Sequence, residues 1–150
     1  LKHGTLAPGQ RLNVPATAVR NISGESRMLL KTGQTVSVDE LLHGLIVQSG
    51  NDAAITLAVN IAGSEAGFVD MMNKEAKRLG MNNTHFANPV GLPVAQHYSS
   101  AYDLALLAAA IDEAITLRDW QAPVKIGWDP MHVEVTGLTV AQARAGNRPE

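Results

Sequence analysis

The feature that most constrains the fold is a pair of predicted helices between Ser37 and Ala62, separated by a polar tripeptide. Ser37 followed by Glu40 matches a capping box, so the first helix is expected to begin at Val38 and to end near Gln48. Its apolar side chains recur at helical spacing on one face, at Leu41, Leu42, Leu45 and Ile46. This pattern predicts an amphipathic helix packed against a core.

The tripeptide Ser49-Gly50-Asn51 interrupts the pattern, because glycine is unfavourable inside a helix and asparagine is a good N-cap. A second helix is expected from Asp52 to about Ala62, and its nearly uniform apolarity predicts burial. A hydroxyl and a carboxamide are therefore presented at a junction between two core helices. Taken alone, the tripeptide is more typical of an ordinary turn and helix cap than of a catalytic site.

Composition limits the function classes that this chain can serve. The 150 residues suffice for one domain with a core, and 45% hydrophobic with 17% charged residues is typical of a globular protein. With 12 basic and 14 acidic residues and no basic stripe, nucleic acid is not an expected partner. The absence of cysteine excludes disulfides and thiolate metal sites. The chain begins at Leu1 with neither methionine nor signal peptide, so we expect it to be a fragment.

Shorter elements are expected before the helix pair. Residues 1–4 resemble the end of a helix, residues 10–14 a short strand and residues 15–20 a helical turn. Residues 26–30 and 34–38 are interpreted as two strands of a hairpin joined by Lys31-Thr32-Gly33.

Two further helices are expected after the pair. Ser64 caps a third helix that ends at Gly80, with a buried face made of Phe68, Val69, Met72, Ala76 and Leu79. A long loop over residues 81–96 follows. Ser100 and Asp103 then form a second capping-box pattern, and the core-facing residues of the fourth helix are expected to be Leu104, Leu107, Ala108 and Ile111.

Together these segments resemble the helical part of the D-alanyl-D-alanine carboxypeptidases, low-molecular-mass penicillin-binding proteins of the penicillin-recognising serine enzyme superfamily. The matching runs keep their order over most of the chain and include residues 26–28, 48–53, 61–64, 78–81, 83–86, 91–93 and 97–101. The resemblance implies an α/β (α+β) parent of the β-lactamase/transpeptidase-like fold. This chain would be its mostly α helical subdomain with short bordering strands. Residues 1–112 would form the helical part and residues 113–150 a divergent or truncated return segment.

The superfamily uses three motifs, Ser-x-x-Lys, Ser-x-Asn and Lys-Thr-Gly. By resemblance, Ser49 would relay a proton at the leaving amine, Asn51 would hold the substrate backbone, and Gly50 would let the turn close and contribute to substrate binding. The Ser-x-x-Lys motif, which supplies the acylated serine and its base, is absent from the sequence and is expected before Leu1.

The third motif is altered. Lys31-Thr32-Gly33 matches its letters, but it lies before the Ser-x-Asn tripeptide in a predicted turn, so we interpret it as structural. Near the end, Val135-Thr136-Gly137 follows Trp128-Asp129-Pro130 as the true motif would, with valine in place of lysine. Thr136 and Gly137 are candidate substrate-binding residues. An unrelated strand pair fits this tail equally well.

The resemblance implies a serine-type D-Ala-D-Ala carboxypeptidase that removes the terminal D-alanine from peptidoglycan stem peptides through an acyl-serine intermediate. The intact parent would bind β-lactam antibiotics covalently and work in the bacterial cell envelope, with any membrane anchor outside this chain. It implies no metal or organic cofactor, and the histidines share no ligand spacing: His3, His43, His85, His97 and His132.

Two alternatives remain. Val135 and a shortened tail favour a degenerate, non-catalytic homologue that binds peptidoglycan or a partner. A class A β-lactamase is less well supported, because no glutamate-containing deacylation motif is found.

Overall fold

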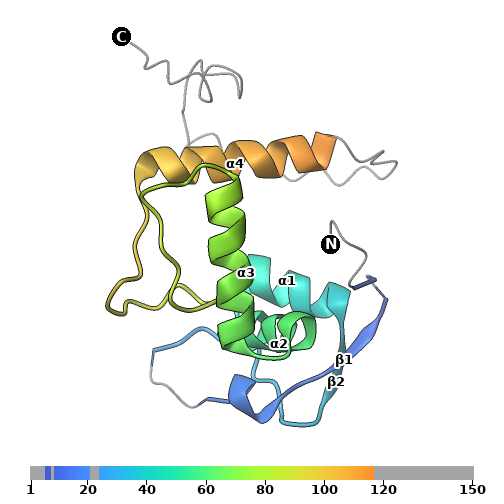
Figure 1. Ribbon diagram of the computed structural model, residues 1–150. Coiled ribbons are helices and arrows are strands. Elements are labelled where there is room, and N and C mark those ends of the chain that lie inside the picture. The colour runs from blue at the N-terminus through green and yellow to red at the C-terminus, as the bar shows by residue number, and fades with distance from the viewer. Residues whose placement is uncertain (1–5, 8, 21–23, 117–150) are drawn as a thin grey trace. The chain divides into compact units, whose positions relative to one another are not determined.

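The computed structural model describes residues 6–7, 9–20 and 24–116, and helices predominate in it (Figure 1). Its elements in chain order are β1 (Arg11–Asn13), a 3-10 turn (Ala16–Ala18), β2 (Thr35–Ser37), α1 (Val38–Gln48), α2 (Asn51–Ala62), α3 (Glu65–Arg78) and α4 (Ala101–Thr116). The expectation of a mostly helical chain with short strands is confirmed. No helix within the described residues is both long and apolar enough to cross a membrane.

The chain divides into two compact units, each described separately below. The first lies within Leu1–Glu75 and His85–Tyr98, and contains both strands, α1, α2 and most of α3. The second lies within Ala76–Thr84 and Ser99–Glu150, and contains the end of α3 and all of α4. The predicted boundary between residues 112 and 113 stays a prediction, because residues 117–150 lie outside the described part.

In the first unit, α1 begins as its sequence predicts. The Glu40 N–H donates to Ser37 Oγ at 3.2 Å, and the Ser37 N–H donates to Glu40 Oε2 at 2.9 Å, which completes the capping box. Hydrogen bonds from the Ser37 side chain and then its backbone lower the pKa of Glu40, with a smaller contribution from the charge of Arg11.

The predicted inner face of α1 is correct except at one end. Leu41 is fully buried, and Leu42 and Leu45 pack against the core, but Ile46 is 78% exposed. Ile46 follows Leu41 by five positions, which is about 140° around a helix of 3.6 residues per turn. It therefore points away from the core that Leu41 faces.

The two strands pair differently from the prediction. β2 pairs antiparallel with β1, with Leu12 opposite Val36, whereas we predicted a hairpin with residues 26–30. Residues 26–30 form no strand because the N–H groups of Met28 and Leu30 donate to the Asp52 carboxylate instead, at 2.9 and 3.0 Å. The predicted strand within residues 10–14 and helical turn within residues 15–20 are confirmed.

α2 lies against α1 beside the β1–β2 ribbon and supplies the middle of the core (Figure 1). Its buried stretch runs continuously from Asp52 to Ala58, as the uniform apolarity predicts, and Gly63 ends the helix in the left-handed region. The N-cap is Gly50 rather than the predicted Asn51. The Ala54 N–H donates to the Gly50 carbonyl at 3.1 Å, so helical hydrogen bonding begins one residue earlier.

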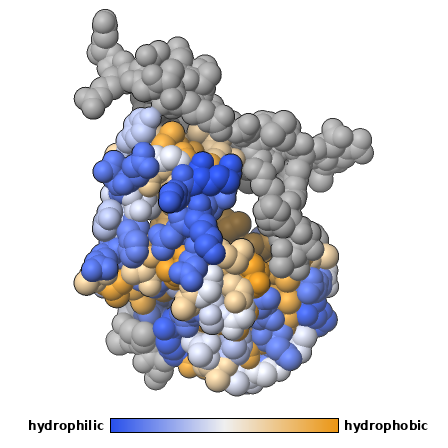
Figure 2. Space-filling view, in the orientation of Figure 1, coloured by the Kyte–Doolittle hydropathy of each residue, from blue (hydrophilic) through white to orange (hydrophobic). Residues whose placement is uncertain are grey.

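α3 is a surface helix capped by Ser64, whose Oγ accepts the Gly67 N–H at 3.0 Å. Ala76 is buried, and the other residues of the predicted inner face are half-buried. Figure 2 shows hydrophilic residues gathered over α3, where its exposed charged side chains are Asp70, Lys74, Glu75, Lys77 and Arg78.

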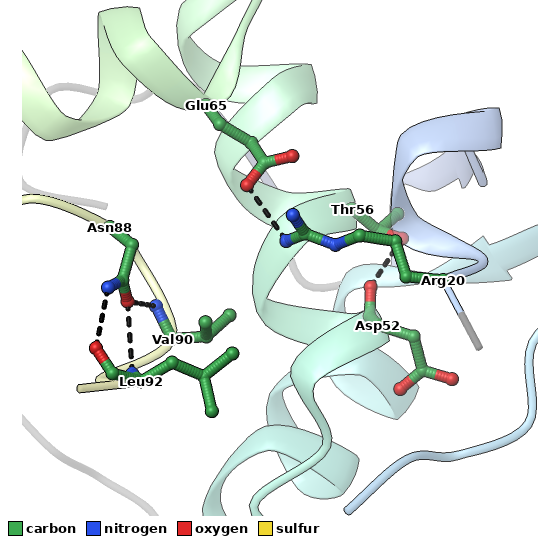
Figure 3. A network of polar contacts seen from close by, with 7 residues as sticks. All are labelled: Arg20, Asp52, Thr56, Glu65, Asn88, Val90 and Leu92. Carbon is green, nitrogen blue, oxygen red and sulfur yellow. Dashed lines mark hydrogen bonds and ion pairs between the residues drawn. The ribbon is translucent and has the colours of Figure 1, made fainter. Parts of the chain in front are cut away.

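Polar contacts in the first unit join distant segments at one place and close a loop at another (Figure 3). Arg20 forms an ion pair of 3.0 Å with Glu65 at the start of α3. Asn88 closes its own loop, because its Oδ1 accepts the N–H groups of Val90 and Leu92, each at 3.1 Å. Val90 in turn packs against the core.

In the second unit, the Asp103 N–H donates to Ser100 Oγ at 3.1 Å, so the start of α4 is as predicted. Its inner face is not: Leu104 and Ile111 are each 52% exposed and Ala108 is exposed, whereas Leu107 is half-buried. The buried residue of the first turn is Asp103, whose carboxylate accepts the Asn83 N–H and the Thr84 hydroxyl. These contacts turn that side of α4 inward.

Candidate active site

The Ser49-Gly50-Asn51 tripeptide forms the short junction between α1 and α2. Ser49 is the residue that follows α1, and its backbone is left-handed, with φ 55° and ψ 40°. Its N–H donates to the Gly44 carbonyl, and its side chain is exposed. Within the described part of the chain the Ser49 hydroxyl has no hydrogen-bond partner, so it is free to donate to and accept from a bound molecule.

Gly50 is buried where the two helices meet. Its N–H also donates to the Gly44 carbonyl, at 3.0 Å. A Cβ atom added at Gly50 would lie 3.1 Å from Met28 Cγ, 3.2 Å from Gly44 O and 3.3 Å from Asp52 Oδ1. A side chain at Gly50 would therefore require its neighbours to shift by a few tenths of an ångström, so glycine fits this junction without adjustment.

Asn51 is the first residue of α2 and is half-buried. Its backbone N–H donates to the Ser26 carbonyl at 2.9 Å. Its carboxamide has no partner among the residues that the structure describes. An amide that can both donate and accept is therefore held on a fixed backbone, next to the Ser49 hydroxyl in sequence.

No role was predicted for Asp52, the residue that follows the tripeptide. Asp52 is 2% exposed, and its carboxylate accepts the N–H groups of Met28, Leu30 and Ala53 at 2.9 to 3.0 Å. Figure 3 shows the opposite end of the residue, where the Thr56 hydroxyl donates to the Asp52 carbonyl at 2.7 Å. The signal in the sequence was a single carboxylate within an otherwise apolar helix.

A shallow hollow of about 350 Å³ lies along α1 before the junction. Met28, Gly44 and Val47 supply its apolar lining, and its polar lining comes from Glu40, His43 and Gln48. Gln48 is the last residue of α1, and Ser49, Gly50 and Asn51 are not among the residues that line the hollow.

The structure describes some of the other candidate site residues and not others. Lys31-Thr32-Gly33 is a turn, in which the Gln34 N–H donates to the Lys31 carbonyl at 2.9 Å and Gly33 has φ 79°, as its structural interpretation predicts. Val135, Thr136 and Gly137 lie outside the described residues. Within the described part, no three His, Asp or Glu side chains group as metal ligands would.

Comparisons with known proteins find similar sequences over much of the chain. The protein family described as D-alanyl-D-alanine carboxypeptidase matches residues 1–125. The D-alanyl-D-alanine carboxypeptidase DacF of Bacillus subtilis is 51% identical over 85 residues, which cover 57% of this chain and 22% of DacF.

Solved structures are similar as well. The D-alanyl-D-alanine carboxypeptidase DacD from Francisella tularensis matches with a TM-score of 0.67 and 48% identity, over 71% of this chain and 25% of that protein. Penicillin binding protein 5 from Haemophilus influenzae matches with a TM-score of 0.73 and 38% identity, over 78% of this chain and 34% of that protein. The chain thus spans about a quarter of the length of the curated relatives it matches.

Proposed function

Because the chain belongs to the D-alanyl-D-alanine carboxypeptidase family and has the helical subdomain of its transpeptidase-like fold, we propose that it supplies the second catalytic motif of such an enzyme. The enzyme is a serine-type carboxypeptidase that removes the terminal D-alanine from peptidoglycan stem peptides in the bacterial envelope. β-Lactams, which imitate the acyl-D-Ala-D-Ala end, are its covalent inhibitors. The observation that supports this most directly is a hydroxyl and a carboxamide at the helix junction, neither of which has a hydrogen-bond partner among the described residues.

The reaction assigns a distinct task to each motif. The serine of a Ser-x-x-Lys motif attacks the carbonyl carbon of the penultimate D-alanine, and the bond to the terminal D-alanine nitrogen breaks. The Ser49 hydroxyl passes a proton to that leaving nitrogen, a role that suits a group able to donate and accept at once. Water then attacks the ester, which releases the shortened peptide and restores the serine.

Asn51 has the complementary task of holding the substrate. Its carboxamide matches a peptide group, because it offers both an N–H donor and a carbonyl acceptor. Orientation of this kind supplies a large share of catalysis when the reacting atoms are aligned. The backbone hydrogen bond from Asn51 to Ser26 and the buried Gly50 hold the main chain from which the carboxamide extends.

In the test, residues 26–101 of this chain replace the corresponding residues of B. subtilis DacF, and the release of D-alanine from a stem pentapeptide is measured. The exchanged enzyme is expected to remain active, and Ser49→Ala or Asn51→Ala to reduce kcat by about 100-fold or more. Thr32→Ala and Asn82→Ala are matched controls, since both residues are exposed and Thr32 belongs to the turn that imitates the third motif. Full turnover by both site variants would overturn the proposal.

A degenerate, non-catalytic homologue is the second candidate. Two observations favour it: valine stands at position 135 where the third motif has lysine, and the family match ends at residue 125, before that position. Such a protein would bind stem peptides or a partner without turnover. Stem-peptide binding that survives Asn51→Ala in this chain would favour it over a retained enzyme cleft.

A further inference from the structure

Residues 26–30, here called the strap, cross the junction between α1 and α2. Ser26 contacts both helix ends at once: its hydroxyl donates to the carbonyl of Gln48, the last residue of α1, and its carbonyl accepts the N–H of Asn51, the first residue of α2. Helix ends leave such groups without intrahelical partners. One residue therefore satisfies the groups on either side of Ser49 and Gly50.

A second pair of contacts holds the next part of the strap. The Gln48 side chain donates through Nε2 to the Arg27 carbonyl at 3.0 Å. The Met28 side chain packs under the junction, against Gly44 and Gly50. The strap is thus joined to α1 as well as to α2.

Asp52 fixes the far end of the strap. Its Oδ1 accepts the Met28 N–H at 2.9 Å and its Oδ2 accepts the Leu30 N–H at 3.0 Å. Hydrogen bonds to an ionised carboxylate are about twice as strong as neutral ones. Both oxygens of one buried side chain therefore hold alternate residues of the strap.

The backbone of Leu29, which lies between Met28 and Leu30, also indicates that Asp52 holds the strap in place. Leu29 has φ 61°, a conformation that leucine rarely adopts, and its side chain is 74% exposed. The left-handed turn at Leu29 directs the neighbouring N–H groups toward the Asp52 carboxylate. Ser49, with φ 55°, is the other left-handed residue of this region. Such strained residues persist only where surrounding contacts determine them.

We propose that Asp52 is a positioning residue for Ser49 and Asn51, which acts by binding the strap across the helix junction. The inference rests on the proposed function of those two residues. Asp52 does not touch the substrate; it binds Met28 and Leu30, and the strap to which they belong places Ser26 against the ends of α1 and α2. Loss of the carboxylate is expected to loosen the junction before it affects the rest of the fold.

The test compares Asp52→Asn with the unaltered chain by NMR and amide hydrogen exchange. Asparagine keeps the size but has only one acceptor oxygen, so one strap N–H loses its partner. Exchange at Met28, Leu30 and Asn51 is expected to accelerate about tenfold or more relative to Leu12 and Val36 in the strands. The Ser49 Cα and Cβ shifts are expected to move away from left-handed values.

Asp39→Asn is the matched control. Asp39 also lies in the first turn of a helix but is exposed and has no hydrogen-bond partner among the described residues, so it reproduces the charge change alone. It is expected to leave the Ser49 shifts and the Asn51 exchange unchanged. Uniform acceleration at all amides in Asp52→Asn, or unchanged Ser49 and Asn51 signals, would overturn the proposal.

Ser26→Ala is the second variant, and it decides the matter if Asp52→Asn does not fold. It removes the strap's hydroxyl bond to the Gln48 carbonyl and leaves Asp52 in place. It is expected to shift the Ser49 and Asn51 resonances, and their constancy would contradict a positioning strap.

An activity measurement links the strap to catalysis. In the DacF enzyme with residues 26–101 exchanged, Asp52→Asn is expected to lower kcat about tenfold with little change in KM. An unchanged kcat beside a strong Ser49→Ala effect would refute the catalytic part of this inference alone. Loss of the Ser49→Ala effect would instead refute the proposed function and leave the NMR result standing.

Discussion

At the residue scale, the helix junction is packed closely around two glycines, Gly44 and Gly50. Gly44 accepts two N–H donors through its carbonyl, from Ser49 and Gly50, while Met28 fills the space that a side chain at Gly44 would occupy. A Cβ atom at Gly44 would lie 2.0 Å from Met28 Sδ and 2.5 Å from its Cγ. A side chain at Gly44, one turn before the junction, would therefore require the Met28 side chain of the strap to shift.

Gly44→Ala is accordingly expected to destabilise the fold by about 1–3 kcal/mol, the usual range for overpacking. Alanine gains about 1 kcal/mol of helix propensity over glycine, so a net loss isolates the steric conflict. Urea unfolding followed by circular dichroism measures the change.

The control for this prediction is a double-mutant cycle with Met28→Ala, which removes the colliding side chain. In the Met28→Ala background, Gly44→Ala should be neutral or stabilising, because only the propensity gain remains. Equal costs in both backgrounds would show that Met28 is not the cause.

At the element scale, each helix is delimited by local chemistry. Ser37 and Glu40 start α1 through reciprocal hydrogen bonds, Ser64 starts α3, and Gly63 ends α2. These signals act over three or four residues and can be read from the sequence. The strap acts over more than twenty residues, from Ser26 to Gln48 and Asn51, so no local pattern revealed it.

The capping box makes the stability of α1 dependent on pH. The bonds from Ser37 lower the folded-state pKa of Glu40 below its unfolded value, so the ionised form stabilises the folded chain. This contribution is complete above the unfolded pKa and is lost as the pH falls through the folded pKa. Acid titration should therefore remove it, and Glu40→Gln should remove the pH dependence of this element.

Ser37→Ala tests the other half of the box and is expected to cost about 1 kcal/mol at neutral pH. It should also return the pKa of Glu40 toward its ordinary range, which an NMR titration of the side-chain carboxyl carbon measures. Ser99→Ala is a suitable comparison, because Ser99 lies outside α1 and its cap. A Glu40 pKa that does not move would mean that Ser37 is not the cause.

The mistaken predictions of strand pairing and of the inner face of α4 share one physical origin. Strand pairing and the inward face of α4 are decided by contacts between distant residues. Asp52 captures the N–H groups of Met28 and Leu30 that a strand would have used. Asp103 turns inward because Asn83 and Thr84 donate to it, and Leu104 consequently faces outward. The helix junction at Ser49-Gly50-Asn51 could be predicted because three adjacent residues encode the helix break, whereas the catalytic role of the tripeptide stays a prediction.

At the scale of the whole molecule, the proposed chemistry requires three motifs, of which this sequence contains only Ser-x-Asn unaltered and in its expected order. Ser49 is an exposed hydroxyl whose side chain has no basic partner in the described part of the chain. A serine hydroxyl without an adjacent base is a weak nucleophile at neutral pH. The sequence contains no Ser-x-x-Lys motif that could supply such a pair.

The chain as printed is therefore expected to form no covalent adduct with penicillin. Incubation with a molar excess of benzylpenicillin followed by intact-mass measurement should return the unmodified mass. The DacF enzyme that contains residues 26–101 should form a one-to-one adduct under the same conditions, since it joins Ser49 and Asn51 to a complete motif set. A stoichiometric adduct on the isolated chain would assign a nucleophile to this sequence itself, and would contradict the division of roles in which Ser49 only relays protons.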